Sequence, residues 1–363
     1  MPLQLRSEEG LTVSVLHPAT DRNKLLTPEG HFRYNHGGYI WQVSDDRVGD
    51  LLTGPEGLPT PPDAIANGQG IPDSFNLRPV QPYVPDGRGL VIGIGEVALD
   101  FNGQHRCVTP CSWEVDDTLP QQLIFRTSHD FENWQLELER TVCLSGRTVS
   151  SHTIIRNQGS ELPFTWYPHP FFPNVGAPGK DPLCRTSPSA RFVDSRGPES
   201  IGFTQDDSAG FVRRSKEIPG MGYLQLVDTT TPLTVMQNHM KVGLITGSCS
   251  FSPQYLPIWG NQNAFSWEPF IEVCVDTPPC KTPHTYTACI SQGGLSTHRD
   301  GSRQGKNIRG RSITHLDCPL ERLCNKRVSS GNVCIFQMIS ILQYSTVCHS
   351  FDLCSLVLCT VIN

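Results

Sequence analysis

The sequence has no segment that is typical of a long, capped amphipathic helix. No window combines apolar residues at helical spacing with capping residues at both ends. Charged residues are also sparse, at 18% of the chain, whereas glycine (32) and proline (30) are frequent and interrupt the hydrophobic segments at short intervals. This composition argues against a helical protein and is typical of many short strands joined by turns.

Two further features of the sequence bear on the compartment and the partners of the protein. Residues 1–10 do not place an apolar segment after a cationic one, as a secretory signal would, so we expect a cytoplasmic protein whose cysteines are thiols. From residue 292 onward eight Lys and Arg stand against four Asp and Glu, which leaves the first 291 residues with a net charge of about −10. An acidic body of this kind does not suit a nucleic-acid groove, so no nucleic-acid partner is expected.

Alternating hydrophobicity is the main structural signal in residues 1–291. Leu11, Val13 and Val15 alternate with Thr12 and Ser14, as in a half-buried strand. Similar segments are WQLELERTVCL, RTVSSHTIIRN, GYLQLVD, PLTVMQ, KVGLITG, AFSWEPFIEVCVD and HTYTACIS, separated by turn signals such as DFNG and LSGR. The pattern predicts an all-β protein with one large antiparallel β-sandwich over residues 1–291, because no linker divides this part into two domains.

Residues 292–363 differ from the body in composition. Their first part is rich in Gly and Arg, and their last part, VCIFQMISILQYSTVCHSFDLCSLVLCTVIN, is apolar. Six of the fourteen cysteines lie between Cys318 and Cys359. Asp352 interrupts the apolar part, which argues against a membrane helix, and the cysteines lack the paired C-x2-C spacing of a structural zinc site. We therefore expect no membrane partner and no metal, and a tail that is disordered or not an evolved part of the fold.

A histidine and a glutamate stand in similar aromatic, proline-containing segments. FTWYPHPFFP places His169 between two prolines, which hold the backbone extended and stiff. NAFSWEPFIE places Glu268 among rings in the same way. A half-buried histidine and an ordinary edge glutamate would give the same local patterns. Together, however, the two residues are what general acid–base catalysis on a sugar requires, since one group takes a proton, the other gives one, and the aromatic faces pack on pyranose C–H groups.

Four segments together resemble those of one enzyme family. WYPHPFFP and FSWEPF are similar to its His and Glu segments. HRCVTPCSWEV resembles a stretch in which a substrate-binding histidine precedes a tryptophan by eight positions, which identifies His105 and Trp113, and NGQGIP resembles a Gly-Ile-Pro segment upstream. The family is the aldose 1-epimerase, or galactose mutarotase-like, superfamily. The resemblance covers about residues 10–291 and implies a galactose mutarotase-like β-sandwich.

The resemblance also implies an activity and a set of site residues. The activity is that of an isomerase that interconverts the α and β anomers of an aldose or aldose phosphate without a metal or organic cofactor. Glu268 would be the base and His169 the acid, which calls for an ionised carboxylate and a protonated imidazole at rest. The candidate substrate-binding residues are His105, Arg78, Trp166, Trp259 and Trp267. A core role is expected for at least two of the aromatic residues, and Arg88 competes with Arg78 for the role of the family's sugar-binding arginine. The alternative is a non-catalytic carbohydrate-binding module of the same fold.

Overall fold

The computed structural model describes nine segments of the chain: residues 2–56, 68–75, 86–175, 181–186, 202–206, 210–214, 221–227, 233–275 and 332–343. Within these segments the regular elements are strands, apart from one short 3-10 turn at Arg22–Lys24. Every pair of neighbouring strands is antiparallel. The prediction of an all-β, antiparallel fold is confirmed.

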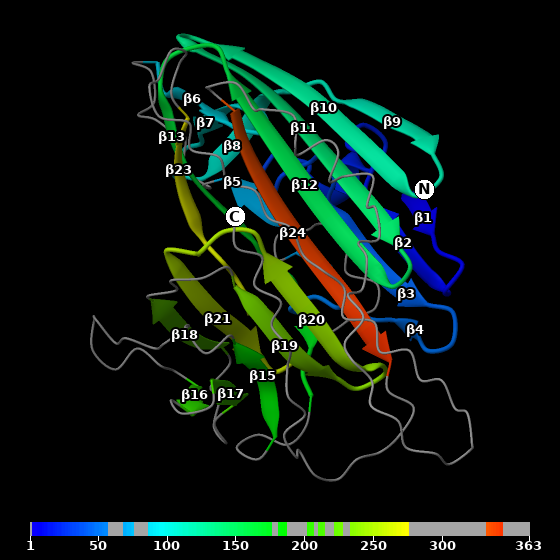
Figure 1. The fold of residues 1–363 in the computed structure, drawn as a ribbon. Coiled ribbons are helices and arrows are strands. Elements are labelled where there is room, and N and C mark those ends of the chain that lie inside the picture. The colour runs from blue at the N-terminus through cyan, green and yellow to red at the C-terminus, as the bar shows by residue number, and fades with distance from the viewer. Residues whose placement is uncertain are drawn as a thin grey trace, which may run out of the picture.

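The largest unit is a ten-stranded sheet that crosses the molecule diagonally in Figure 1. Its strands in spatial order are β16 (Phe203–Asp206), β17 (Phe211–Arg214), β15 (Pro182–Thr186), β19 (Thr234–His239), β20 (Gly243–Cys249), β24 (Asn332–Gln343), β12 (Thr148–Asn157), β11 (Trp134–Ser145), β10 (Gln122–Phe131) and β9 (Glu114–Leu119). Along β10, Leu123 and Phe125 are buried and alternate with half-buried neighbours, so one face of the sheet points to the core.

Four smaller sheets share a core with this sheet. They are β1 (Leu3–Arg6), β2 (Leu11–Val15), β3 (Ile40–Asp45) and β4 (Gly49–Asp50); β23 (Ile271–Val275), β13 (Leu162–Pro168) and β5 (Asp73–Phe75); β14 (Phe172–Pro173), β22 (Ala264–Trp267), β21 (Tyr255–Asn261) and β18 (Met221–Val227); and β6 (Arg88–Val91), β7 (Gly95–Leu99) and β8 (His105–Pro110). Val13, Phe125 and Trp267, from three different sheets, belong to one cluster of buried side chains. The sheets therefore pack face to face as a sandwich around one core.

One strand of the large sheet comes from the C-terminal part of the chain. β24 lies between β12 and β20, with Ser340 opposite both Thr148 and Thr246, and is the long orange strand in Figure 1. The structure therefore differs from the expectation of a tail outside the fold at residues 332–343, while the rest of residues 292–363 lies outside the described segments. None of the helical structure that is described has the length and apolar character needed to cross a membrane.

Candidate active site

His169 lies directly after β13, at a point where the backbone is fixed by β5. Pro168 at the end of β13 pairs with Asp73, and the His169 N–H donates a hydrogen bond of 2.8 Å to the carbonyl oxygen of Pro72. Pro170 follows and restricts the backbone on the other side. The His169 side chain is buried, so its imidazole has a fixed place inside the protein.

Glu268 has the same relation to a strand end. It follows β22, and its N–H donates a hydrogen bond of 2.9 Å to the carbonyl oxygen of Pro257 in β21. Its carboxyl group is also buried, and Oε1 lies 3.2 Å from Nε2 of His169. The structure thus brings together the histidine and the glutamate that the sequence singled out, in direct side-chain contact.

Aromatic rings enclose the His169–Glu268 pair. Phe171 stacks on the imidazole with ring centroids 4.3 Å apart. Trp259 of β21 and Tyr34 approach the imidazole edge-on, at 5.6 Å and 6.0 Å between centroids. The pair therefore lies in surroundings of low polarity, where electrostatic interactions and proton positions depend strongly on each neighbouring charge.

Burial shifts both pKa values toward the neutral forms of the two groups. It raises the pKa of Glu268 to about 8, against a smaller opposite effect of the Arg33 charge. Burial and the same positive charge hold the pKa of His169 well below its ordinary value. Both shifts run against the expectation of a charged carboxylate and imidazolium at rest, because burial favours a carboxylic acid beside a neutral imidazole.

Arg33 and Tyr34 belong to this site and were missed by the sequence analysis. The charge of Arg33 acts on both His169 and Glu268, and its guanidinium carbon lies 5.1 Å from the centre of the Tyr34 ring. The available signal was the segment RYNHGGY, in which adjacent glycines follow a basic and an aromatic residue. At such glycines a backbone can pass close to another part of the structure.

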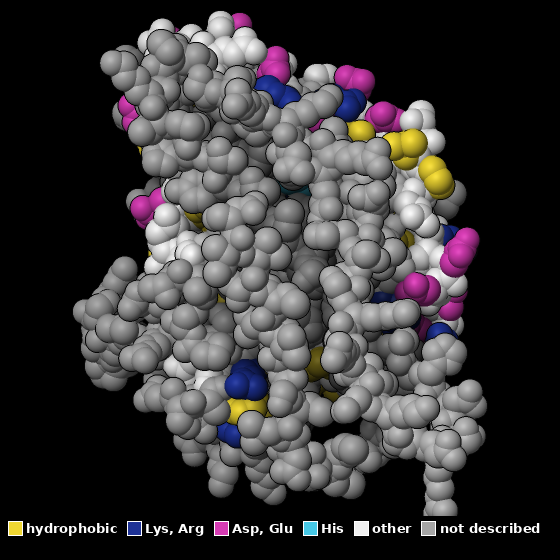
Figure 2. Space-filling view, viewed as in Figure 1, with side chains coloured by type: hydrophobic (Ala, Val, Ile, Leu, Met, Phe, Trp, Pro, Cys, Tyr) yellow, Lys and Arg dark blue, Asp and Glu magenta, His cyan; other side chains and the backbone are white. Residues whose placement is uncertain are grey.

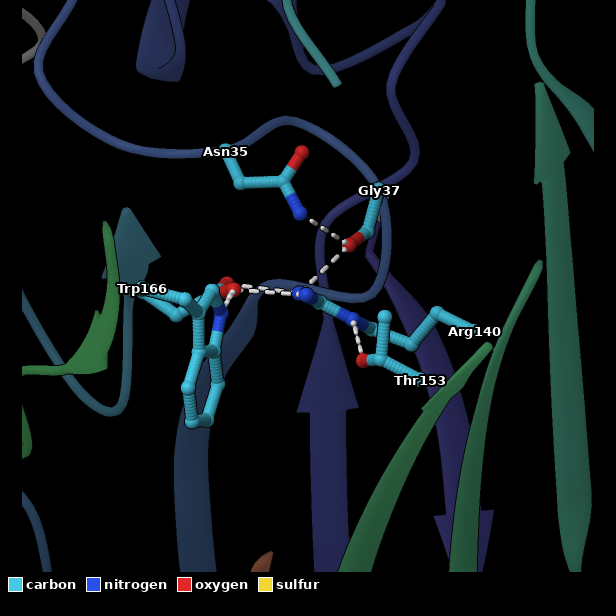
Figure 3. Close-up of polar contacts among 6 residues, drawn as sticks. Asn35, Gly37, Arg140, Thr153 and Trp166 are labelled. Atoms are coloured by element: carbon cyan, nitrogen blue, oxygen red, sulfur yellow. Dashed lines mark hydrogen bonds and ion pairs between the residues drawn. The ribbon is translucent and has the colours of Figure 1, made fainter. Parts of the chain in front are cut away.

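A buried ion pair connects several of the elements around the site (Figure 3). Arg140 of β11 donates to Asp73 of β5 at 2.6 Å, to the carbonyl oxygen of Gly37 at 3.1 Å and to Thr153 of β12 at 3.0 Å. The indole N–H of Trp166 in β13 donates to the same Asp73 carboxylate. The ion pair thus ties β13, which leads to His169, and the loop that carries Arg33 and Tyr34 to the large sheet.

Two of the three tryptophans proposed to bind a sugar have other roles in the structure. Trp166 is buried and bonded to Asp73, and Trp267 is fully buried and donates to Gln237 at 2.8 Å. Trp259 is only half-buried and lies against the imidazole. Trp259 therefore remains the candidate for contact with a ligand, which agrees with the expectation that at least two aromatic residues serve the core.

The remaining predicted residues are not joined to the pair by the contacts described above. His105 begins β8 and pairs with Leu99 of β7, so its place in the site stays a prediction, and Arg78 lies outside the described residues. Arg88 forms ion pairs with Asp86 at 2.7 Å and Glu96 at 3.0 Å. Its charge is therefore already compensated by two carboxylates.

Two other arginines lie on strands near one edge of the large sheet. Arg213 of β17 and Arg185 of β15 lie 5.8 Å and 5.4 Å from the ring centre of Phe211. Figure 2 shows a hydrophobic side chain between two cationic ones in the region where these strands lie. The arginine charge that acts on the His169–Glu268 pair is that of Arg33.

Comparison with known proteins gave matches among solved structures alone. No protein-family model matches the sequence, and neither does any curated protein. The Slr1438 protein from Synechocystis sp. PCC 6803 is 12% identical, with 95% of this chain and 96% of that chain covered and a TM-score of 0.49. The galactose mutarotase related enzyme from Lactobacillus acidophilus is 12% identical (94% and 97% covered, TM-score 0.48), and a galactose mutarotase-like protein from Lactobacillus casei is 16% identical (94% and 100% covered, TM-score 0.44). Each of these three matches covers at least 94% of this chain.

Proposed function

We propose that this protein interconverts the α and β anomers of an aldose, as an isomerase of the aldose 1-epimerase type. The observation that carries the proposal is the buried contact of 3.2 Å between His169 Nε2 and Glu268 Oε1. Anomer exchange requires one proton to leave the C1 hydroxyl group and one to reach the ring oxygen. A carboxyl group and an imidazole that share a proton can perform both transfers.

The neutral resting pair contains the number of protons that the reaction needs. Moving the proton of the Glu268 carboxyl group to Nε2 of His169 gives a carboxylate and an imidazolium without exchange with solvent. The Nδ1 atom of His169 is buried and has no hydrogen-bond partner within the described part of the chain. An imidazolium carries N–H groups on both nitrogens, so Nδ1 can donate to a ligand while Nε2 stays on the glutamate.

The reaction then follows as a balanced sequence. The Glu268 carboxylate takes the proton of the C1 hydroxyl group as the imidazolium of His169 gives a proton to the ring oxygen. The bond between C1 and the ring oxygen breaks, and the C1–O bond becomes the carbonyl of the open-chain aldehyde. Rotation about the C1–C2 bond exposes the other face of the aldehyde. Ring closure then reverses both transfers: Glu268 gives its proton to the C1 oxygen, and His169 takes back the proton of the attacking hydroxyl group.

The surroundings of the pair suit a carbohydrate. Trp259 offers a half-buried ring on which the C–H face of a pyranose can pack. Arg33 offers a cation that can bind sugar hydroxyl groups or a phosphate group. Free aldoses and aldose phosphates are therefore both included in the proposed substrate class.

Polarimetry or saturation-transfer NMR on free and 6-phosphorylated hexoses tests the proposal. We expect acceleration of anomer exchange for at least one sugar, and a rate loss on the order of 10² to 10⁴ in Glu268→Gln, because an amide cannot take the proton. His169→Asn should lose a comparable factor. The matched control is Glu272→Gln, which alters an exposed carboxylate on the neighbouring strand β23.

The alternative function, a carbohydrate-binding module without turnover, gives a different result. In that case one sugar binds to the wild-type protein and to Glu268→Gln with similar affinity, and no sugar in the panel is interconverted faster than in buffer. Such a result would refute the proposed isomerase and leave the carbohydrate as ligand.

A further inference from the structure

The hydroxyl group of Tyr34 is a buried polar atom beside the proposed site. The Tyr34 side chain is 3% exposed, and within the described segments its oxygen has no hydrogen-bond partner. Leaving a buried hydroxyl group unbonded costs free energy, so a native protein that keeps one calls for an explanation. A ligand that completes the missing hydrogen bonds is one such explanation.

The ring of Tyr34 lies close to the reacting groups. It meets the imidazole of His169 edge-on, with 6.0 Å between centroids and 78° between planes. Burial is the main reason that the pKa of Tyr34 is raised, and an electrostatic interaction with Glu268 adds to it. The phenol therefore keeps its proton and can both donate and accept a hydrogen bond.

The ring of Tyr34 cannot easily turn away to find another partner. Gly68 has a φ of +91°, and a Cβ atom on it would lie 2.6 Å from Cε2 of Tyr34 and 2.8 Å from Cε2 of Phe171. The two rings therefore pack directly against the backbone at a position where glycine leaves room for them. The hydroxyl group is held in place before any ligand arrives.

Tyr39 is a nearby tyrosine with the opposite property. Its ring lies 6.2 Å from that of Tyr34, and it is also buried. Its hydroxyl group donates to the carbonyl oxygen of Gln69 at 2.9 Å and accepts from the N–H of Gln69 at 3.1 Å. The two tyrosines belong to one cluster of buried side chains. Within the described segments the chain supplies hydrogen bonds to the hydroxyl group of Tyr39 but not to that of Tyr34.

We propose that the Tyr34 hydroxyl group is a specificity-determining contact of the site, which exchanges a hydrogen bond with a ring hydroxyl group of the sugar whose C1 faces Glu268. The proposal rests on the proposed function, because it takes the ligand to be an aldose. It predicts that the protein recognises a ring hydroxyl group in addition to the anomeric centre. A sugar without that hydroxyl group would leave the Tyr34 oxygen unbonded in the complex.

The first test compares the stabilities of Tyr34→Phe and Tyr39→Phe. Tyr34→Phe removes an oxygen that has no partner in the free protein, so its melting temperature should equal or exceed that of the wild type. Tyr39→Phe removes a phenol with two hydrogen bonds, so its melting temperature should fall. A clear loss of stability in Tyr34→Phe would show that the hydroxyl group already has a partner, and would overturn the proposal.

The second test measures sugar affinity by titration calorimetry and anomer exchange by NMR, with a series of deoxyhexoses. Tyr34→Phe should lower kcat/KM for the full sugar about tenfold. One deoxy sugar should be poorer than its parent for the wild type but equal to its parent for Tyr34→Phe, which identifies the hydroxyl group that Tyr34 binds. Equal kcat/KM for wild type and variant with every sugar would overturn the inference and leave the isomerase standing.

The remaining outcomes separate the two proposals. If the wild-type protein binds a sugar without accelerating anomer exchange, and Tyr34→Phe weakens that binding, the isomerase is refuted while the Tyr34 contact holds. If no sugar binds to the wild-type protein or is interconverted by it, both proposals are refuted.

Discussion

Replacing Glu268 with glutamine should change the pH dependence of stability in a defined direction. Burial raises the pKa of this carboxyl group from 4.5 to about 8, so between these values the folded protein binds a proton that the unfolded chain has lost. Wild-type stability therefore falls as the pH rises through this window. At about 1.4 kcal/mol per pH unit, the full effect is roughly 5 kcal/mol, of which about 4 kcal/mol develops between pH 5 and pH 8.5.

The glutamine variant removes this dependence while keeping the contact. Its amide N–H can donate to Nε2 of His169 in place of the acid proton. The free energy of unfolding of Glu268→Gln, relative to the wild type, should therefore rise by about 4 kcal/mol from pH 5 to pH 8.5. The contribution of His169, whose pKa is lowered by burial, is lost as the pH falls below the ordinary histidine value and is present in both proteins, so it largely cancels in the difference.

Urea unfolding followed by tryptophan fluorescence at a series of pH values measures this difference. The control is Glu272→Gln, because this glutamate is exposed on β23 and its stability difference from the wild type should stay flat. A difference for Glu268→Gln that is constant with pH, or that grows toward acid, would refute the account of a buried, protonated carboxyl group.

Three further predictions concern the frame of the site. Asp73→Asn leaves the buried Arg140 without its carboxylate and should lower the free energy of unfolding by about 3–5 kcal/mol in urea titrations; a loss under about 1 kcal/mol would contradict this. Gly38→Ala should lower the free energy of unfolding by about 2 kcal/mol more than Gly87→Ala in the same assay. Both glycines have a positive φ (+72° and +82°), but a Cβ atom would lie 2.4 Å from the Arg140 side chain at Gly38 and would meet nothing within 4 Å at Gly87. Deleting residues 292–363 removes β24 from between its neighbours and should abolish cooperative unfolding, whereas a shortened protein with an unchanged transition would show that the body needs no such strand.

Local patterns were sufficient to predict the class of fold and several strands. Leu11–Val15 and Thr148–Asn157 form β2 and β12. Both could be predicted because apolar and polar residues alternate along a half-buried strand, and this alternation is visible in the sequence. β24 was missed because residues 332–343 are mostly apolar and do not alternate strictly between apolar and polar. Without that alternation, periodicity cannot distinguish a strand between two others from a buried helix.

The site could be predicted where proline and aromatic residues mark it locally, and not where it depends on distant contacts. His169 and Glu268 stand in segments whose composition sets them apart, and they meet at 3.2 Å. The role of Trp166 depends on Asp73, which is 93 residues away, so nothing near Trp166 indicated it. The charge state of the pair was also beyond the sequence, because the extent of burial decides it.

The position of β24 has a consequence for how the protein is made. It is the last described strand in chain order, yet it lies between β20 and β12, which are synthesised much earlier. At a ribosomal rate of about 5–20 residues per second, the edge of β12 waits on the order of ten to forty seconds for the strand that will cover it. The two halves of the large sheet are thus exposed on the nascent chain as open edges able to pair with other chains. The yield of folded protein should therefore depend on how well these open edges are kept from pairing with other chains until β24 is made, as well as on the stability of the finished sandwich.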